Sequence, residues 1–219
     1  MSEHHHEHGP DGVDPTHRHP PQPDLEDAPV TRAEVLQVAL TELLIDKGVF
    51  TAAEMRRQIE VMDSLSPARG ARLVARAWVD EGFKGRLVAD SHAAGAELGL
   101  DLGPIPILVM ENTPAVHNVI VCTLCSCYPR MLLGLPPDWY KSRAYRSRVV
   151  REPRALLREF GTEVADGVEV RVHDSNADMR YMVLPMRPTG SEDLDETALA
   201  ALVTRDCLIG VALPRPTGG

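Results

Sequence analysis

The stretch Val116-His-Asn-Val-Ile-Val-Cys-Thr-Leu-Cys-Ser-Cys127 is the most informative part of the sequence. Its first six residues predict a buried strand, and three cysteines follow where that strand should end. Cys122, Cys125 and Cys127 fall within six residues, which is too crowded for the disulfide framework of a secreted protein. The spacing therefore predicts metal or redox chemistry in a loop at a strand exit.

A Cys-Ser-Cys tripeptide can offer a metal more than its thiolates. If the peptide nitrogens of Ser126 and Cys127 lose their protons, they can lie in one plane with the sulfurs of Cys125 and Cys127. Cys122 would then bind from below that plane, and one coordination position would stay open. Removing an amide proton requires a strongly Lewis-acidic ion, so this arrangement suits Co(III) or Fe(III) better than Zn(II) or Mg(II).

The spacing by itself leaves other uses of the cysteines open. C-x-x-C-x-C could belong to a zinc site completed by His117 or His173, and on spacing alone zinc is the stronger interpretation. Zinc sites usually combine two ligand pairs separated along the chain, however, and no second pair occurs here. A transient disulfide is a further alternative. The fourth cysteine, Cys207, lies in an apolar run over residues 207–213 that predicts a strand, and we expect it to be a core thiol.

Composition excludes several classes of partner. The chain has 219 residues, a formal net charge of −9 and only 4% aromatic residues, which argues against binding to nucleic acid or anionic membranes. No apolar run approaches the roughly 20 residues that span a bilayer, and the N-terminus lacks the pattern of a signal peptide. We therefore expect a cytoplasmic protein.

The chain divides into three regions by composition and periodicity. Residues 1–29 are rich in His, Pro, Asp and Glu and predict a disordered tail, which either is tag-like and solvating or collects metal weakly. Residues 30–82 predict a helical arm, and residues 83–219 predict a catalytic, metal-binding α+β domain.

Capping signals and periodicity predict the individual elements. Capping boxes at Thr31-Arg-Ala-Glu34 and Thr51-Ala-Ala-Glu54 begin two helices, which end near Gly48 and Ser64. Further helices are predicted over residues 67–81, 87–98, 138–140, 142–150, 153–160 and 195–203, and strands over 116–121, 168–172, 180–184 and 207–213.

Motifs on both sides of the cysteines resemble one known family. They are Glu111-Asn-Thr-Pro114, Val116-His-Asn-Val119, Val121-Cys-Thr-Leu-Cys-Ser-Cys127, Leu133-Gly-Leu-Pro-Pro137, Trp139-Tyr-Lys141, Arg148-Val-Val-Arg-Glu-Pro153, Arg180-Tyr-Met-Val-Leu-Pro185 and Thr204-Arg-Asp206. Together they resemble the α subunits of cobalt-type nitrile hydratases over nearly the whole ordered length. The resemblance implies an α+β fold with a layered α/β/β/α domain and an N-terminal helical arm.

The resemblance also implies a role for each residue of the cysteine loop. Cys122 would be an unmodified axial thiolate, Cys125 a sulfinate and Cys127 a sulfenate, with Ser126 contributing its peptide nitrogen. Thr123 is the family's mark for cobalt, so we expect one non-corrin Co(III) per chain and regard Fe(III) as less expected.

The reaction implied is the hydration of a nitrile to its amide at the open coordination position. Catalysis would fall to Cys125, Ser126 and Cys127, with either the Cys127 sulfenate or an activated water as the nucleophile. Arg180 resembles a supporting arginine of the family, although a strand arginine in a buried ion pair is an equal alternative.

The family resemblance also implies protein partners. A β subunit, as one chain or two, would supply two arginines to the sulfur oxygens, and an activator protein would load the metal.

Two departures from the family pattern affect the substrate. Tyr128-Pro-Arg130 stands where hydratases usually show a Trp-Pro pair, and it is similar to the cobalt-bearing γ subunit of thiocyanate hydrolase, which is the alternative function. Gly103-Pro-Ile-Pro106 lacks a Gln-Gly-Glu common in the family, which predicts a wider pocket and a large or heteroaromatic nitrile. An alternative of another class is a non-catalytic protein that binds zinc or handles cobalt.

Overall fold

The computed structural model describes residues 29–215, and the chain divides into two compact units, Met1–Met55 and Arg56–Gly219. The tail predicted over residues 1–29 lies, except for its last residue, outside this described part. Within residues 29–215, no helix is both long and apolar enough to cross a membrane. The first unit contains helix α1 (Arg32–Asp46), and helix α2 (Ala52–Ser64) crosses the boundary between the units.

Helices α1 and α2 begin at the two predicted capping boxes. The Thr31 hydroxyl accepts a hydrogen bond from the Glu34 backbone N–H, and the Glu34 carboxylate accepts one from the Thr31 N–H at 2.7 Å. Thr51 and Glu54 repeat this exchange at the start of α2. Neither helix has a buried residue, and α1 exposes a set of large apolar side chains: Val35, Leu36, Val38, Leu40 and Leu43.

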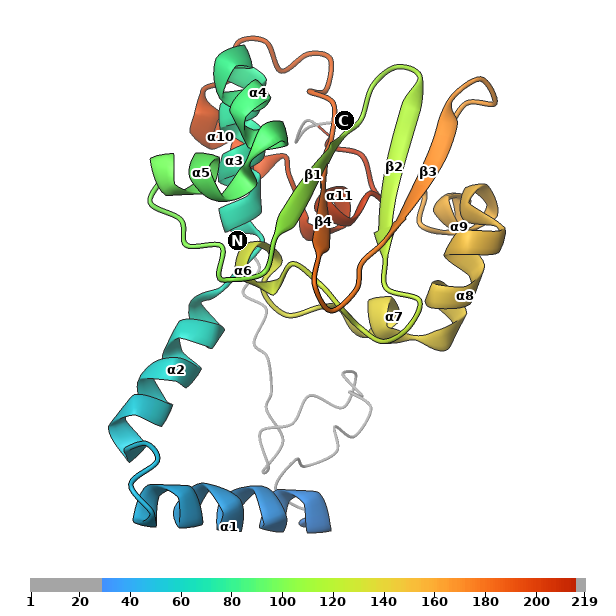
Figure 1. Ribbon diagram of the computed structural model, residues 1–219. Coiled ribbons are helices and arrows are strands. Elements are labelled where there is room, and N and C mark those ends of the chain that lie inside the picture. Colours follow the sequence, from blue (N-terminus) through green and yellow to red (C-terminus); the bar gives the residue numbers. More distant parts are fainter. Residues whose placement is uncertain (1–28, 216–219) are drawn as a thin grey trace, which may run out of the picture. The chain divides into compact units, whose positions relative to one another are not determined.

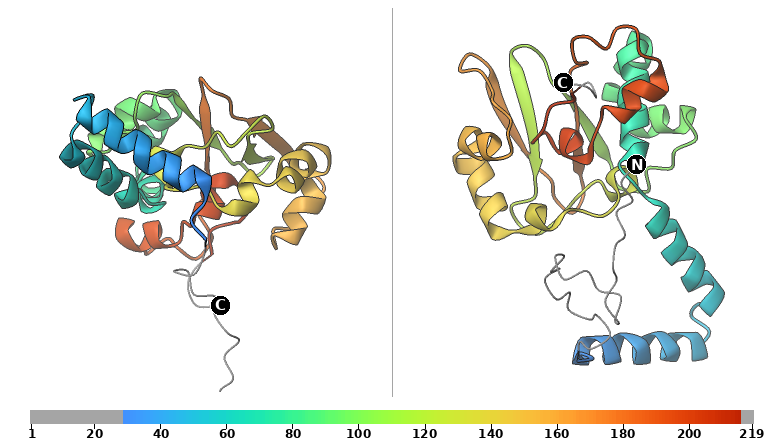
Figure 2. Two further views of the ribbon diagram at one scale, coloured as in Figure 1. Left: turned by 90° about the horizontal axis from the view of Figure 1, so that it is seen from below. Right: turned by 180° about the vertical axis from the view of Figure 1, so that it is seen from behind.

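Four short strands form the centre of the second unit, as Figure 1 shows. Strand β1 (Ile107–Glu111) pairs in parallel with β4 (Arg180–Leu184), and β2 (Val116–Val121) pairs in parallel with β3 (Glu169–Asp174). Helices pack on both sides of the strands (Figures 1 and 2), and helices with strands together confirm the predicted α+β class.

The helices around these strands have the following bounds. Those that lie together beside β1 are α3 (Ala68–Val79), α4 (Glu81–Ala89), α5 (Ser91–Glu97) and α10 (Glu196–Ala201). The others are α6 (Arg130–Leu133), α7 (Asp138–Lys141), α8 (Arg143–Arg151), α9 (Pro153–Glu159) and α11 (Arg205–Ile209).

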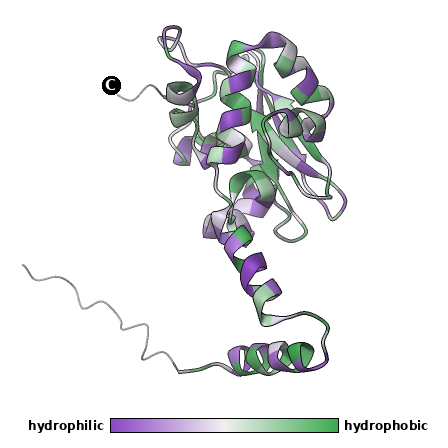
Figure 3. Ribbon diagram, turned by 90° about the vertical axis from the view of Figure 1, so that its left-hand side faces the viewer, coloured by the Kyte–Doolittle hydropathy of each residue, from purple (hydrophilic) through white to green (hydrophobic). Residues whose placement is uncertain are grey.

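Helix α3 belongs to the core, although we expected the arm to continue to residue 82. Leu73 and Val74 are fully buried and join the same hydrophobic cluster as the strand residues Val119 and Val183. Figure 3 shows the contrast between the largely hydrophobic strands and the mixed outer helices. Helix α3 therefore lies within the second unit, Arg56–Gly219, where its apolar face is buried.

Two aspartates interrupt the predicted helices over 67–81 and 87–98. Asp80 ends α3 and caps α4, since its side chain accepts from the Phe83 N–H at 2.8 Å. Asp90 does the same between α4 and α5, accepting from the N–H groups of His92 and Ala93. The prediction of these boundaries was wrong, because aspartate inside a helical pattern was not recognised as a cap.

The predicted strand over residues 207–213 was also wrong. Residues 205–209 form α11, whose first turn is capped by the Thr204 side chain and whose end is fixed by Gly210 at φ +89°. The apolar run over residues 207–213 suits a buried helix as well as a buried strand, and the caps at Thr204 and Gly210 decide between them. Cys207 is buried as expected, but on a helix. Strand β1 and helix α6 were not predicted at all.

Gly210 offers a test of how tightly α11 packs on β2. A Cβ atom at this position would overlap the Asn118 carbonyl oxygen, and the positive φ adds strain for any other residue. We expect Gly210→Ala to lower the free energy of unfolding by about 3 kcal/mol or more, as measured by urea denaturation.

Gly161→Ala is the matched control, because Gly161 has φ +78° but open space around it. We expect this variant to lose only about 1 kcal/mol. Equal losses in the two variants would show that backbone conformation, and not the contact with Asn118, sets the cost.

Candidate metal centre

The parallel pairing of β2 with β3 places the cysteine loop. Val121, the last residue of β2, is in register with Asp174, the last residue of β3. Parallel strands end at the same edge of a sheet, so the chain leaving β2 at Cys122 passes directly beside Asp174. The loop Cys122–Cys127, called the claw loop below, therefore starts from a buried strand and reaches the surface at Cys125.

The three cysteines of the claw loop converge as predicted. Their sulfurs all lie within 4.8 Å of one another, with Cys122 Sγ and Cys125 Sγ 3.4 Å apart and Cys125 Sγ and Cys127 Sγ 3.3 Å apart. For a metal–sulfur bond of about 2.3 Å, a right angle at the metal separates two sulfurs by about 3.3 Å and a tetrahedral angle by about 3.8 Å. The observed spacing therefore fits square or octahedral geometry better than the tetrahedron of zinc.

Two cysteines of the claw loop, Cys125 and Cys127, differ in their pKa values. A hydrogen bond from Cys127 is the main cause that lowers the pKa of Cys125 to about 7, and Cys122 adds to it. Burial is the main cause that raises the pKa of Cys127 to about 12, and its hydrogen bond to Cys125 adds to it. The thiol of Cys125 therefore loses its proton more readily than that of Cys127.

Asp174 clamps the first turn of the claw loop. Its carboxylate accepts a hydrogen bond from the Thr123 backbone N–H at 2.8 Å and one from the Thr123 hydroxyl at 2.5 Å. Thr123 therefore faces the end of β3 through its polar atoms. The clamp fixes the conformation of the residue that directly follows Cys122.

Side chains of α7 and α8 support the same loop from other directions. The Tyr140 hydroxyl donates to the Cys127 carbonyl at 3.0 Å, and the Tyr145 hydroxyl donates to the Ile120 carbonyl at 2.7 Å. Arg146 donates to the Thr123 carbonyl at 3.3 Å. Burial raises the pKa of both tyrosines, so they remain protonated donors at neutral pH.

The two histidines of the zinc alternative have other partners. His117 Nε2 lies 2.8 Å from the Gly210 carbonyl oxygen, and His173 Nε2 lies 2.8 Å from Asn118 Oδ1. Burial lowers the pKa of each ring, as expected for neutral structural histidines. Within residues 29–215, no histidine or carboxylate joins the three sulfurs, so a closed four-ligand zinc site is not formed by this part of the chain.

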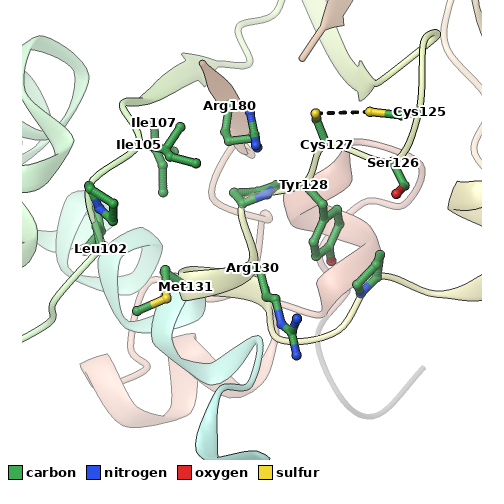
Figure 4. A pocket seen from close by; sticks show the side chains of 13 residues that line it. Leu102, Ile105, Ile107, Cys125, Ser126, Cys127, Tyr128, Arg130, Met131 and Arg180 are labelled. Atoms are coloured by element: carbon green, nitrogen blue, oxygen red, sulfur yellow. Dashed lines mark hydrogen bonds between the residues drawn. The ribbon is translucent and has the colours of Figure 1, made fainter. Parts of the chain in front are cut away.

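A cavity of about 500 Å³ opens beside the claw (Figure 4). Cys125, Ser126 and Cys127 line one side of it, and most of the remaining wall is apolar: Leu102, Pro104, Ile105, Ile107, Pro129, Met131 and Pro136. Its two charged lining residues are Arg130 and Arg180, both cationic. A small molecule in this cavity would meet the cysteines on one side and an apolar wall on the other.

Arg180 lies at the start of β4, in the strand that the sequence predicted, and it lines the cavity. Its guanidinium donates to the backbone carbonyls of Asn176 and Met179, and its charge partly offsets the burial that raises the pKa of Cys127. No ion pair involves Arg180 among the described residues, so the alternative of a buried ion pair is not observed there.

Sequence reasoning missed three residues that hold the claw loop: Asp174, Tyr140 and Arg146. An acidic residue at the end of a strand parallel to the cysteine-bearing strand could have signalled Asp174. The predicted strand ended at residue 172, however, and strand order cannot be read from one sequence. Tyr140 and Arg146 gave no signal beyond the helices that carry them.

The site defines a class of protein: a metal-binding subunit with a cysteine claw at a strand exit and an adjoining apolar cavity. The family model for the nitrile hydratase alpha chain matches residues 31–212. The low-molecular weight cobalt-containing nitrile hydratase subunit alpha of Rhodococcus rhodochrous is 49% identical over 178 residues, covering 80% of this chain and 86% of the relative. This chain belongs to the nitrile hydratase alpha-chain family.

Thiocyanate hydrolase provides two further matches. The subunit gamma from Thiobacillus thioparus is 42% identical over 208 residues, covering 90% of this chain and 85% of the relative. A solved structure described as recombinant thiocyanate hydrolase comprising partially-modified cobalt centers superposes with a TM-score of 0.81 at 43% identity. It covers 86% of this chain and 92% of that chain. The thiocyanate hydrolase chain thus has the same fold as this chain.

The clamp between Asp174 and Thr123 can be tested through metal retention. Asp174→Asn keeps the shape of the side chain but turns an amide donor toward one of the two donors on Thr123. We expect the variant, purified with its metal, to lose it about tenfold faster to a chelator, as followed by elemental analysis and the metal–thiolate absorption band.

Asp178→Asn is the control, because Asp178 is an exposed aspartate in the loop between β3 and β4. It should retain metal like the wild type. Unchanged retention in Asp174→Asn would mean that the claw holds its shape without the clamp.

Proposed function

We propose that this chain is the α subunit of a nitrile hydratase, which hydrates a nitrile to its amide at a non-corrin Co(III) centre. One observation carries the proposal: in a chain of this family, three cysteine sulfurs lie within 4.8 Å of one another, and two of these cysteines, Cys125 and Cys127, line a cavity of about 500 Å³. The sulfurs of Cys122, Cys125 and Cys127, with the peptide nitrogens of Ser126 and Cys127, would hold the ion. Thr123 favours cobalt over iron.

When bound, the trivalent ion supplies a Lewis acid that polarises the nitrile. The residues of the chain do the rest. Cys127, oxidised to a sulfenate, presents an oxygen to the cavity that either attacks the nitrile carbon or orients the attacking water. Cys125, oxidised to a sulfinate, accepts hydrogen bonds at the rim, and Ser126 orients solvent there.

Arg180 and the apolar wall shape the environment of this reaction. The guanidinium of Arg180 is held by two backbone carbonyls, so it presents a fixed positive charge beside Cys127. That charge stabilises oxygen anions on the cysteines. Leu102, Ile105 and Ile107 exclude water from the opposite side and receive the organic part of the nitrile.

The chain works with a second subunit. Alpha subunits of this family imply a β partner, and the described residues agree, since the apolar side chains of α1 are exposed among residues 29–215. The β partner, as one chain or two, supplies cations to the oxidised cysteines. A separate activator protein loads the metal.

Thiocyanate hydrolysis is the second candidate. Tyr128-Pro-Arg130 follows the claw directly, and Arg130 adds a positive charge to the cavity wall. Within residues 29–215, its side chain has no acidic partner. A cationic cavity would attract the thiocyanate anion more strongly than a neutral nitrile.

The complex of this chain with its partner, produced with cobalt, should contain one cobalt per chain and convert benzonitrile to benzamide. Mass spectrometry of the claw peptide should show oxygen added at Cys125 and Cys127. Turnover of thiocyanate without turnover of any nitrile would favour the second candidate. Stoichiometric zinc with reduced thiols would overturn both in favour of a non-catalytic metal-binding protein.

The size of the cavity predicts substrate preference. Because the wall opposite the claw is apolar, we expect kcat/KM for benzonitrile to exceed that for acetonitrile by about tenfold or more. Ile105→Trp should fill part of the cavity and reduce the preference, whereas Val88→Trp, at an exposed residue outside it, should not. Comparable kcat/KM for both nitriles in the wild type would contradict a cavity built for large substrates.

A further inference from the structure

A second hollow, which shares no lining residue with the substrate cavity, lies beside the start of the claw loop. It has a volume of about 490 Å³ and is lined by Thr123 of the claw loop and by five residues of α8: Arg143, Arg146, Ser147, Val150 and Arg151. Arg146 connects the two elements through its hydrogen bond to the Thr123 carbonyl. Figure 1 shows α8 at the end of the strands from which the claw loop emerges.

The three arginines of this hollow have no acidic partner among residues 29–215. Arg148, on the same helix, forms ion pairs with Glu152 and Glu159. In the described part of the chain, by contrast, no ion pair involves Arg143, Arg146 or Arg151. A cluster of three uncompensated guanidinium groups is unexpected on a chain with a net charge of −9.

Most N–H donors of these arginines also have no protein acceptor among residues 29–215. Each guanidinium has five N–H donors. Arg146 donates to the Thr123 carbonyl, and Arg151 donates to the Ser147 carbonyl at 3.1 Å. The Nε of Arg146 is buried and has no acceptor among the described residues. These donors suit carboxylates that come from outside the chain.

Two exposed apolar side chains accompany the charges. Leu124, next to Thr123 in the claw loop, is 85% exposed, and Val150 in the hollow is 51% exposed. Arginines around apolar side chains are typical of protein interfaces, where the apolar groups are buried and the arginines bind partner carboxylates. A partner that covers Leu124 would also help to exclude water from a metal held by the claw.

We propose that Arg143, Arg146, Arg151, Leu124 and Val150, called the arginine face below, bind an acidic segment of the second subunit that carries at least one large apolar residue. Guanidinium groups that have no acidic partner among the described residues select carboxylates of a partner. A segment that packs on Val150 and Leu124 would also cover the exposed side of the claw loop. The inference rests on the proposed assembly with a second subunit but not on the substrate.

The experiment measures association of the two subunits. The double variant Arg143→Glu/Arg151→Glu reverses two charges and leaves Arg146, which supports the claw loop, in place. Arg72→Glu/Arg158→Glu is the matched control, because both arginines are exposed, lie on α3 and α9 outside the hollow, and change the net charge equally. Each variant is co-produced with the second subunit, and the dissociation constant of the complex is measured at low and high salt.

We expect the arginine-face variant to raise the dissociation constant at least about tenfold at low salt, and the control by much less. The difference should shrink at high salt, where the wild-type contact is screened. Equal effects of the two double variants would reduce the result to general charge repulsion and overturn the proposal.

Other occupants of the arginine face give different results. Should the variant change only self-association of this chain, a second copy occupies the face and the proposal is wrong. A second test deletes the acidic residues 1–29 from the wild type and from the arginine-face variant. If this deletion weakens the wild-type complex less than the variant complex, residues 1–29 compete for the arginine face and the proposal is wrong. A complex that assembles as expected but turns over no nitrile would instead contradict the proposed function alone.

Discussion

The crowding of three cysteine sulfurs at the end of one buried strand is the constraint on which the rest of this structure depends. Neighbouring thiolates repel each other, and the pKa of Cys125 is lowered whereas that of Cys127 is raised. A bound cation would offset the repulsion between thiolates, so metal binding would complete the claw. The surroundings must then keep the loop in one shape before and after the metal arrives.

Three elements distant in sequence share that task. The end of β3 contributes Asp174, α7 contributes Tyr140 and α8 contributes Arg146, and each binds the backbone or the side chain of the claw loop. The parallel register of β2 with β3 is what brings Asp174 within reach, so the strand pairing sets the metal site as well as the core. Packing of Gly210 against the Asn118 carbonyl oxygen fixes β2 from its other side.

The claw loop is bordered by two surfaces of different character. The cavity beside Cys125 and Cys127 combines an apolar wall with Arg130 and Arg180. The arginine face borders Thr123 and is cationic and partly apolar, a character typical of protein interfaces. One short loop therefore contributes residues to two hollows of different character.

The sequence alone determined what is local. The capping boxes at Thr31 and Thr51 predicted the starts of two helices, because a capping box is complete within four residues. The apolar runs of β2 and β4 predicted the bounds of both strands to the residue. Convergence of the cysteines followed from their spacing in one tight loop. Two of the missed boundaries are local as well, since Asp80 caps α4 and the caps at Thr204 and Gly210 define α11. Tertiary structure decided what depends on contacts between distant segments: the burial of α3 against the strands, and the clamp between Asp174 and Thr123. The two partners of such a contact lie far apart along the chain, so no single stretch of sequence contains both.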